Sequence, residues 1–297
     1  MRRWLASVAL MAAAALAAAG CSSPPAGVDG DLTDDWKPLA EAEAFVPEVG
    51  VCHATVVESG YLANYRPIDC AGSHMTQTVY VGTFSGAAAE VPNPVAAGSP
   101  EYTAAFAQCD KEATAYLGAN WRTARLTVNL VLSSPEAWRG GTKWYRCDVS
   151  EVRSLDDTSL APRSGSLKGA LTKASPLALT CFNPKLAGDD VEEMVPVACG
   201  KKHRSEFVGI YTATEDTYDA FRRNDSRTHE GCLSVVASYA KLPKDGNLQY
   251  RAGTIYYFPQ EDEWHRGNRG VKCFLWRSDR TFTASVKGAG TRVLPVG

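Results

Sequence analysis

Eight of the nine cysteines fall into two sets of four that share their order and part of their spacing. Seventeen residues separate the first two cysteines of each set. An even number of cysteines in an exported chain favours disulfide bonds over thiol or metal chemistry, because the compartment is oxidising. Spacing alone leaves three pairings open in each set, and we predict that the first cysteine pairs with the second and the third with the fourth. The two sets are Cys52, Cys70, Cys109 and Cys147, and Cys181, Cys199, Cys232 and Cys273.

A histidine follows the second cysteine of each set at the same offset: His74 in the first set and His203 in the second. An imidazole titrates near neutrality and can donate or accept a proton, so each could bind an anionic ligand or a partner. The alternative, which we favour, is that each ring bonds to a loop carbonyl beside a disulfide. A metal site is not expected, because it needs reduced thiols and more ligands, and neither His53 nor His229 has a counterpart in the other set.

A tryptophan precedes the fourth cysteine of each set in the pattern W-x2-G-x5-C, which places Trp138 before Cys147 and Trp264 before Cys273. These rings could form an exposed platform for sugar rings or a peptide, but a tryptophan near a disulfide is more often a core anchor. With the cysteines, the histidines and a shared S-[LV]-K-G segment, seven landmarks recur in the same order. We therefore predict an internal duplication.

Patterns typical of catalysis are missing from the sequence. There is no G-x-S-x-G elbow, no H-E-x-x-H helix, no phosphate-binding G-x-x-x-x-G-K-[ST] loop and no C-x-x-C redox pair. The acidic run 261–263 is interpreted as a solvated turn. We expect a protein that is not an enzyme and that needs no cofactor.

The elements that must position these residues can be read from periodicity. Ser99 and Pro100 are typical of a helix start, apolar residues then recur on one helical face, and Gly118 ends the run. Alternating or β-branched segments predict strands at 77–84, 124–132, 143–152, 206–213, 253–258 and 271–276. Strands on both sides of one helix indicate an α+β fold, with two tandem repeats that each contain a mainly antiparallel sheet and one main helix.

The N-terminus has the features of an export signal. Two arginines precede an apolar run over 4–20, which is short for a membrane-spanning helix. The run ends in Ala18-Ala19-Gly20-Cys21, which resembles the lipobox of bacterial lipoproteins, although that family usually has leucine where Ala18 stands. The resemblance implies cleavage before Cys21 and acylation there, including palmitate, and two or more acyl chains give stable anchoring. An ordinary signal peptide cut near Ala19, or an uncleaved anchor, is the alternative.

Composition limits the partners. The formal net charge of the 297-residue chain is -2, without a long block of one sign, which argues against nucleic acid and against a polybasic membrane patch. The stretch 21–50 begins with serine, proline and glycine and continues with aspartates, so it is expected to be a flexible tether. The predicted organisation is a signal peptide at 1–20, this tether, and two domains at 51–170 and 177–290.

The two units resemble the septum-formation domain of actinobacterial envelope proteins. That domain has spaced cysteines, a histidine soon after the second, and a Pro…Trp-x-x-Gly…Cys segment near its end. The resemblance implies a role in septum formation during cell division, with no reaction attached to it. We expect a lipid-anchored protein on the outer face of the cytoplasmic membrane that binds an envelope or division protein. The alternative is an envelope enzyme or sensor acting on peptidoglycan or its precursors, with the two histidines supplying the chemistry.

Overall fold

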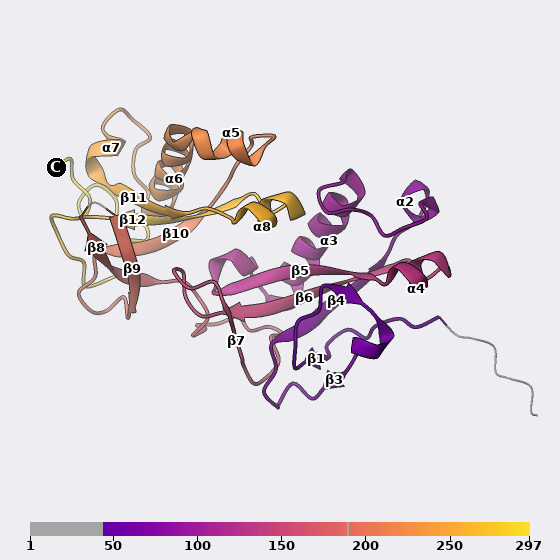
Figure 1. Ribbon diagram of the computed structural model, residues 1–297. Helices are drawn as coiled ribbons and strands as arrows, with labels where there is room; N and C mark the ends of the chain where they lie inside the picture. The colour runs from indigo at the N-terminus through magenta and orange to yellow at the C-terminus, as the bar shows by residue number, and fades with distance from the viewer. Residues whose placement is uncertain (1–43, 189) are drawn as a thin grey trace, which may run out of the picture. The chain divides into compact units, whose positions relative to one another are not determined.

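The computed structural model describes residues 44–188 and 190–297 of the chain. They form an α+β fold with two sheets, and each sheet has one long helix packed against it (Figure 1). We call residues 45–176 the first half and residues 177–297 the second half. The predicted signal peptide, the lipidation residue Cys21 and most of the predicted tether lie outside the described residues. No helix in the described part of the chain is long and apolar enough to cross a membrane.

The sheet of the first half has the strand order β2-β5-β6-β4-β1-β3, and β7 pairs with β6. Its neighbours are antiparallel except for β2 and β5, which run parallel. Its strands are β1 Cys52–His53, β2 Ser59–Gly60, β3 Pro67–Ile68, β4 Thr76–Thr83, β5 Leu126–Ser133, β6 Trp144–Val152 and β7 Leu160–Ala161.

The sheet of the second half is fully antiparallel and has the order β11-β12-β10-β8-β9. Its strands are β8 Cys181–Ala187, β9 Asp190–Val197, β10 Ser205–Thr212, β11 Gly253–Tyr257 and β12 Gly270–Trp276. Each strand expected from periodicity is present within two residues of its predicted ends. The β8–β9 hairpin was not predicted.

One long helix packs on each sheet, α3 Pro100–Leu117 on β4, β5 and β6, and α6 Asp225–Ala240 on β10, β11 and β12 (Figure 1). The predicted start of α3 is confirmed, because the Ser99 side chain accepts a hydrogen bond from the Tyr102 amide. Gly118 ends the helix with a φ of 88°. Lys241 takes the same left-handed conformation at the end of α6, with a φ of 56°. Shorter helices are α2 Ala87–Glu90, η2 Leu62–Asn64, η3 Trp121–Thr123, α4 Pro135–Arg139, α5 Tyr218–Arg223, α7 Leu248–Arg251 and α8 Glu261–Arg266.

Four disulfides join these elements with the predicted pairing. Cys109–Cys147 ties α3 to β6, and Cys232–Cys273 ties α6 to β12, with all four residues fully buried in the cores between helix and sheet. Cys52–Cys70 and Cys181–Cys199 close loops at the edge of each sheet, each with a sequence separation of 18.

Two predictions about loops need correction. The acidic run 261–263 is the first turn of α8 rather than a solvated turn: the Glu263 side chain accepts a hydrogen bond from the Gln260 amide, which completes a capping box. The last residues of the predicted tether pack on the first sheet. Phe45 lies 4.7 Å from the Tyr65 ring, and its carbonyl accepts a hydrogen bond from the Trp144 indole. An aromatic side chain within a polar stretch was the signal for this contact.

Candidate functional site

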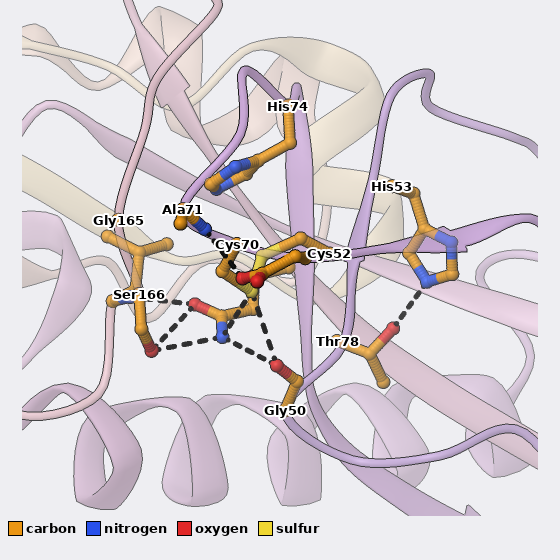
Figure 2. Close-up of a disulfide and its surroundings, with 12 residues drawn as sticks. Gly50, Cys52, His53, Cys70, Ala71, His74, Thr78, Gly165 and Ser166 are labelled. Atoms are coloured by element: carbon orange, nitrogen blue, oxygen red, sulfur yellow. Dashed lines mark hydrogen bonds between the residues drawn. A yellow bond between two sulfur atoms is a disulfide. The ribbon is translucent and has the colours of Figure 1, made fainter.

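The two histidines singled out by their spacing are buried, at 1% exposure for His74 and 0% for His203. His74 Nδ1 donates to the Gly72 carbonyl at 2.9 Å, and His203 Nδ1 donates to the Lys201 carbonyl at 2.8 Å. Figure 2 shows the His74 ring close to the first disulfide of its half. A buried ring that bonds a carbonyl two residues away favours the structural interpretation of both histidines.

The two tryptophans are core residues. Trp138 is 0% exposed, and its indole donates to the Val91 carbonyl at 2.8 Å. Trp264 is 1% exposed and stacks on Phe221 with ring centroids 4.6 Å apart. A cation five residues later covers each ring, Lys143 in the first half and Arg269 in the second. Neither indole forms an exposed platform, so the core-anchor alternative describes their positions.

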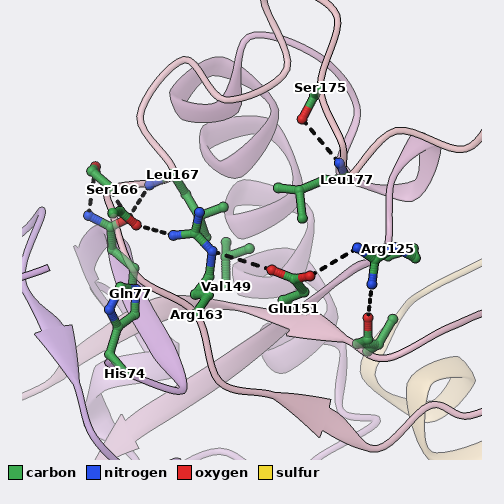
Figure 3. Close-up of polar contacts among 12 residues, drawn as sticks. His74, Gln77, Arg125, Val149, Glu151, Arg163, Ser166, Leu167, Ser175 and Leu177 are labelled. Carbon is green, nitrogen blue, oxygen red and sulfur yellow. Dashed lines mark hydrogen bonds and ion pairs between the residues drawn. The ribbon is translucent and has the colours of Figure 1, made fainter. Parts of the chain in front are cut away.

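On the strand after each histidine, one polar side chain accepts a hydrogen bond from a backbone amide near the C-terminal end of its half. Gln77 Oε1 accepts a hydrogen bond from the Leu167 amide at 2.7 Å (Figure 3). Glu206 Oε2 accepts from the Val286 amide at 2.8 Å, and Oε1 accepts from the Tyr239 hydroxyl at 2.5 Å. Both side chains therefore have structural partners.

One group of side chains in the described part of the chain has ligand atoms close enough for a metal ion: Cys181, Cys199 and Glu206. Both sulfurs belong to a disulfide, however, whereas a metal is bound by thiolate. The group is therefore not a metal site.

A buried polar cluster lies on the face of the first sheet that α3 does not cover. Asp148 pairs with Arg146 at 3.0 Å and accepts a hydrogen bond from the Thr78 hydroxyl at 2.8 Å. His53 Nε2 lies 3.1 Å from the same hydroxyl (Figure 2). The same nitrogen lies 3.3 Å from Arg146 Nη1. Burial, assisted by the Arg146 charge, lowers the pKa of His53 to about 4, and burial raises the pKa of Asp148. All four side chains are at most 4% exposed, so the cluster has no open access.

The second sheet has phenylalanines at the matching positions. In the β4–β6 ladder, Thr78 faces Asp148 just before a bulge; in the β10–β12 ladder, Phe207 faces Phe274 just before a bulge. Phe182 follows its cysteine as His53 follows Cys52, and its ring lies 5.4 Å from that of Phe274.

An open cavity lies between the two halves. It has a volume of about 290 Å³, close to the lower limit of about 300 Å³ for small-ligand pockets. The first half contributes η3, β5 and the segment between β6 and β7, and the second half contributes β11, α8 and β12. We call this cavity the cleft. Aromatic and aliphatic side chains form part of its wall, among them Trp121, Leu126, Leu155, Tyr257 and Phe258.

Polar contacts between the halves hold the cleft in place. Arg122 Nε donates to Asn268 Oδ1 at 2.6 Å. Arg266 Nη1 donates to Asn129 Oδ1 at 2.8 Å. Gly270 allows the first of these contacts, because a Cβ at this position would lie 2.4 Å from the Arg122 Cδ. The two halves are therefore joined beside the cavity by hydrogen bonds between their side chains.

Lys272 lines the cleft from β12, where its neighbours across the sheet are Tyr257 on the edge strand β11 and Ile210 on β10. Its ammonium group has no hydrogen-bond or ion-pair partner within residues 44–188 and 190–297. Burial lowers the pKa of Lys272; the Glu263 charge acts in the opposite direction, and the Arg122 charge lowers the pKa further.

This lysine was missed in the sequence, although a signal was present. Lys272 stands immediately before Cys273, as Arg146 stands immediately before Cys147. A basic residue directly before the fourth cysteine of each half is therefore the signal that points to Lys272.

Comparison with known protein families identifies the class to which this disulfide-bonded α+β chain belongs. A family model described as Septum formation matches residues 49–273, well over half of the chain. The chain therefore belongs to the septum-formation family, as its cysteine, histidine and tryptophan landmarks predicted. The single match runs through both sheets. Comparisons with the curated proteins and with the solved structures found no match.

Proposed function

We propose that this protein acts in septum formation as a non-catalytic binding protein, held on the outer face of the cytoplasmic membrane by acyl chains on Cys21. Membership of the septum-formation family supports the process. The Ala18-Ala19-Gly20-Cys21 sequence supports the anchor. Four disulfides suit a domain that folds in an oxidising compartment.

The observation that carries the binding role is the cleft. It combines a partly apolar wall, an unpaired lysine and an open polar rim that includes the exposed side chains of Thr158 and Gln260. Apolar walls with a few directed polar groups are typical of sites that bind a ligand or a partner's side chain. Because both halves contribute to the wall, the binding site needs the two halves together.

We further propose that the two halves are tandem copies of one unit. The strand order β5-β6-β4-β1-β3 matches β11-β12-β10-β8-β9 strand for strand. Each copy has a disulfide from its long helix to the corresponding strand and a bulge one residue after a matching pair. The copies then differ on the face of the sheet that the long helix does not cover. In the first copy this face holds the buried polar cluster of Arg146 and Asp148, and in the second copy it contributes Lys272 to the cleft.

An envelope enzyme built on His74 and His203 would need imidazoles that reach a substrate. Both rings are buried, with each Nδ1 bonded to a backbone carbonyl. We therefore propose binding rather than catalysis.

The test is to follow the protein in dividing cells with an externally fluorescent fusion at the C-terminus, which keeps residues 1–50 intact. Enrichment at the septum is expected. A photo-crosslinking amino acid at Gln260, on the rim of the cleft, should then capture a partner at the septum. The same group at Tyr250, which is 56% exposed and does not line the cleft, is the matched control. An even distribution around the envelope, or equal capture from both positions, would contradict the proposal.

A further inference from the structure

Each half places a basic residue immediately before its fourth cysteine, and the two have different surroundings. Arg146 and Asp148 lie two residues apart on β6, share a face, and form a buried ion pair at 3.0 Å. On β12 the same two positions hold Lys272 and Phe274. Phe274 is fully buried and packs on neighbouring aromatic rings, including Phe207 at 5.4 Å. The second half therefore keeps the cation and lacks the carboxylate that neutralises it in the first half.

Other charged groups around the cleft have partners of their own. Arg122 forms an ion pair at 2.5 Å with Asp110, a residue that does not line the cleft. Arg266 forms an ion pair with Asp262, one turn earlier on α8.

Glu263 is the acid whose charge acts on Lys272, and it too has local donors. Its Oε2 accepts from the Gln260 amide at 3.0 Å, and its Oε1 lies 3.4 Å from the Thr127 hydroxyl. No carboxylate of the described residues lies within ion-pair distance of Lys272. A largely buried ammonium without a partner is costly, which makes this point of the cleft attractive to an anion.

We propose that the cleft binds a carboxylate, which accepts a hydrogen bond from the Lys272 ammonium and supplies the negative charge that Asp148 supplies in the first half. One uncompensated cation matches one negative charge, and the nearby Glu263 disfavours an anion with a higher charge, such as phosphate. The aromatic wall at Tyr257 and Phe258 suits an apolar or peptide group attached to the carboxylate. The proposal deepens the proposed function and rests on it for the use of the same cleft.

The test is calorimetric titration of the purified full chain, with its disulfides intact, against four probes. These are acetate, N-acetylglycylglycine, the amide of that dipeptide, and inorganic phosphate. A carboxylate should bind, and the amide should bind at least tenfold more weakly, because hydrogen bonds to charged groups are the strong ones. Tighter binding of the dipeptide than of acetate would assign the site to peptide carboxylates, and equal binding would assign it to free carboxylic acids. Phosphate binding as tight as that of both carboxylates would overturn the proposal.

Variants locate the binding on one side chain. Lys272→Met should weaken carboxylate binding about ten- to a hundredfold, and Lys272→Arg should keep it within a few-fold. Lys202→Met, at an exposed lysine that does not line the cleft, should leave binding unchanged. In the unaltered protein, carboxylate should shift the backbone amide resonances of Tyr257 and Gly270, a measurement that does not depend on the folding of any variant. Undiminished binding by Lys272→Met, or amide shifts confined to other regions, would overturn the proposal.

These outcomes are separable from those of the cell experiment. Septal enrichment without carboxylate binding overturns this inference and leaves the proposed function in place. Carboxylate binding by a protein that is spread evenly around the envelope overturns the septal role and supports the inference.

Discussion

Asp148 and Phe274 occupy the same position in the two sheets: each follows the fourth cysteine of its half and faces the residue before a bulge in the neighbouring strand. Asp148 completes a buried polar cluster, whereas Phe274 completes an aromatic one. The Arg146 charge is thus neutralised by Asp148 inside the protein. Lys272, two residues before Phe274, has no carboxylate at that position and lines the cleft.

Removal of the Asp148 carboxylate should destabilise the protein strongly. In Asp148→Ala the Arg146 charge stays buried without its partner, and we expect the free energy of unfolding to fall by about 3 to 5 kcal/mol. Urea unfolding at pH 7 measures the change. Glu136→Ala, which removes a surface ion pair to Arg139, should leave stability almost unchanged. A loss for Asp148→Ala no larger than that of the control would contradict the prediction.

The disulfide between α6 and β12 should contribute more to stability than the one that closes the β8–β9 hairpin. The chain-entropy relation gives about 4 kcal/mol for the separation of 41 residues between Cys232 and Cys273, and about 3 kcal/mol for the separation of 18 between Cys181 and Cys199. Replacing each pair by alanine and comparing urea midpoints under oxidising conditions tests the order. The reverse order would show that loop closure is not the governing factor.

Stability should depend on pH through His53. Burial and the Arg146 charge lower its pKa from 6.5 to about 4, so protonation favours the unfolded chain. The stabilisation is complete above pH 6.5 and is lost as the pH falls towards 4. Asp148, another member of this cluster, has a pKa raised by burial and acts in the opposite direction.

The contribution of His53 is therefore measured as a difference between variants. Between pH 6.5 and 4, the free energy of unfolding of the unaltered protein should fall by about 1 to 3 kcal/mol relative to His53→Gln. His265→Gln, at a ring that is 59% exposed, is the matched control and should follow the unaltered protein. Parallel pH profiles for the unaltered protein and His53→Gln would refute the assignment.

A side chain at position 270 should loosen the contact between the halves. In Gly270→Ala the new Cβ would lie 2.4 Å from the Arg122 Cδ and 2.6 Å from its Nε, so the bond from Arg122 to Asn268 has to shift. We expect a loss of about 1 to 3 kcal/mol in stability and faster hydrogen exchange along η3 and β12. Gly200→Ala, where nothing lies within 4 Å of the new Cβ, should show neither effect. Unchanged exchange in Gly270→Ala would argue against this interface.

Replacement of the predicted lipidation residue should release the protein from the membrane. In Cys21→Ser no thioether to diacylglycerol can form, so the chain should move from the membrane fraction to the soluble extracytoplasmic fraction or the medium. The mass of the N-terminal peptide of the unaltered protein provides an independent measurement. An unacylated N-terminus starting near residue 20 would support the ordinary signal peptide instead.

The elements that depend on local pattern were predictable from the sequence. The Ser99 cap, Pro100 and Gly118 define α3 through short-range hydrogen bonds, and alternation defines β5 because successive side chains of a strand point to opposite faces. The matched cysteines limited each half to three pairings, and the proposed pairing is the one that the structure contains. The family, too, could be recognised from these landmarks.

The tertiary structure decided which of these residues are accessible. His74 and Trp138 were candidates for binding by chemical type, but burial depends on what packs over them, and that is not written in their spacing. The cleft depends on contacts such as that between Arg122 and Asn268, 146 residues apart in the chain. Lys272 is a binding candidate because it lines the cleft and because Phe274, two residues later on β12, supplies no carboxylate to pair with it. Local pattern determines strands and helices, whereas the environment of a charge is set by segments far apart in the sequence, and only the folded chain brings them together.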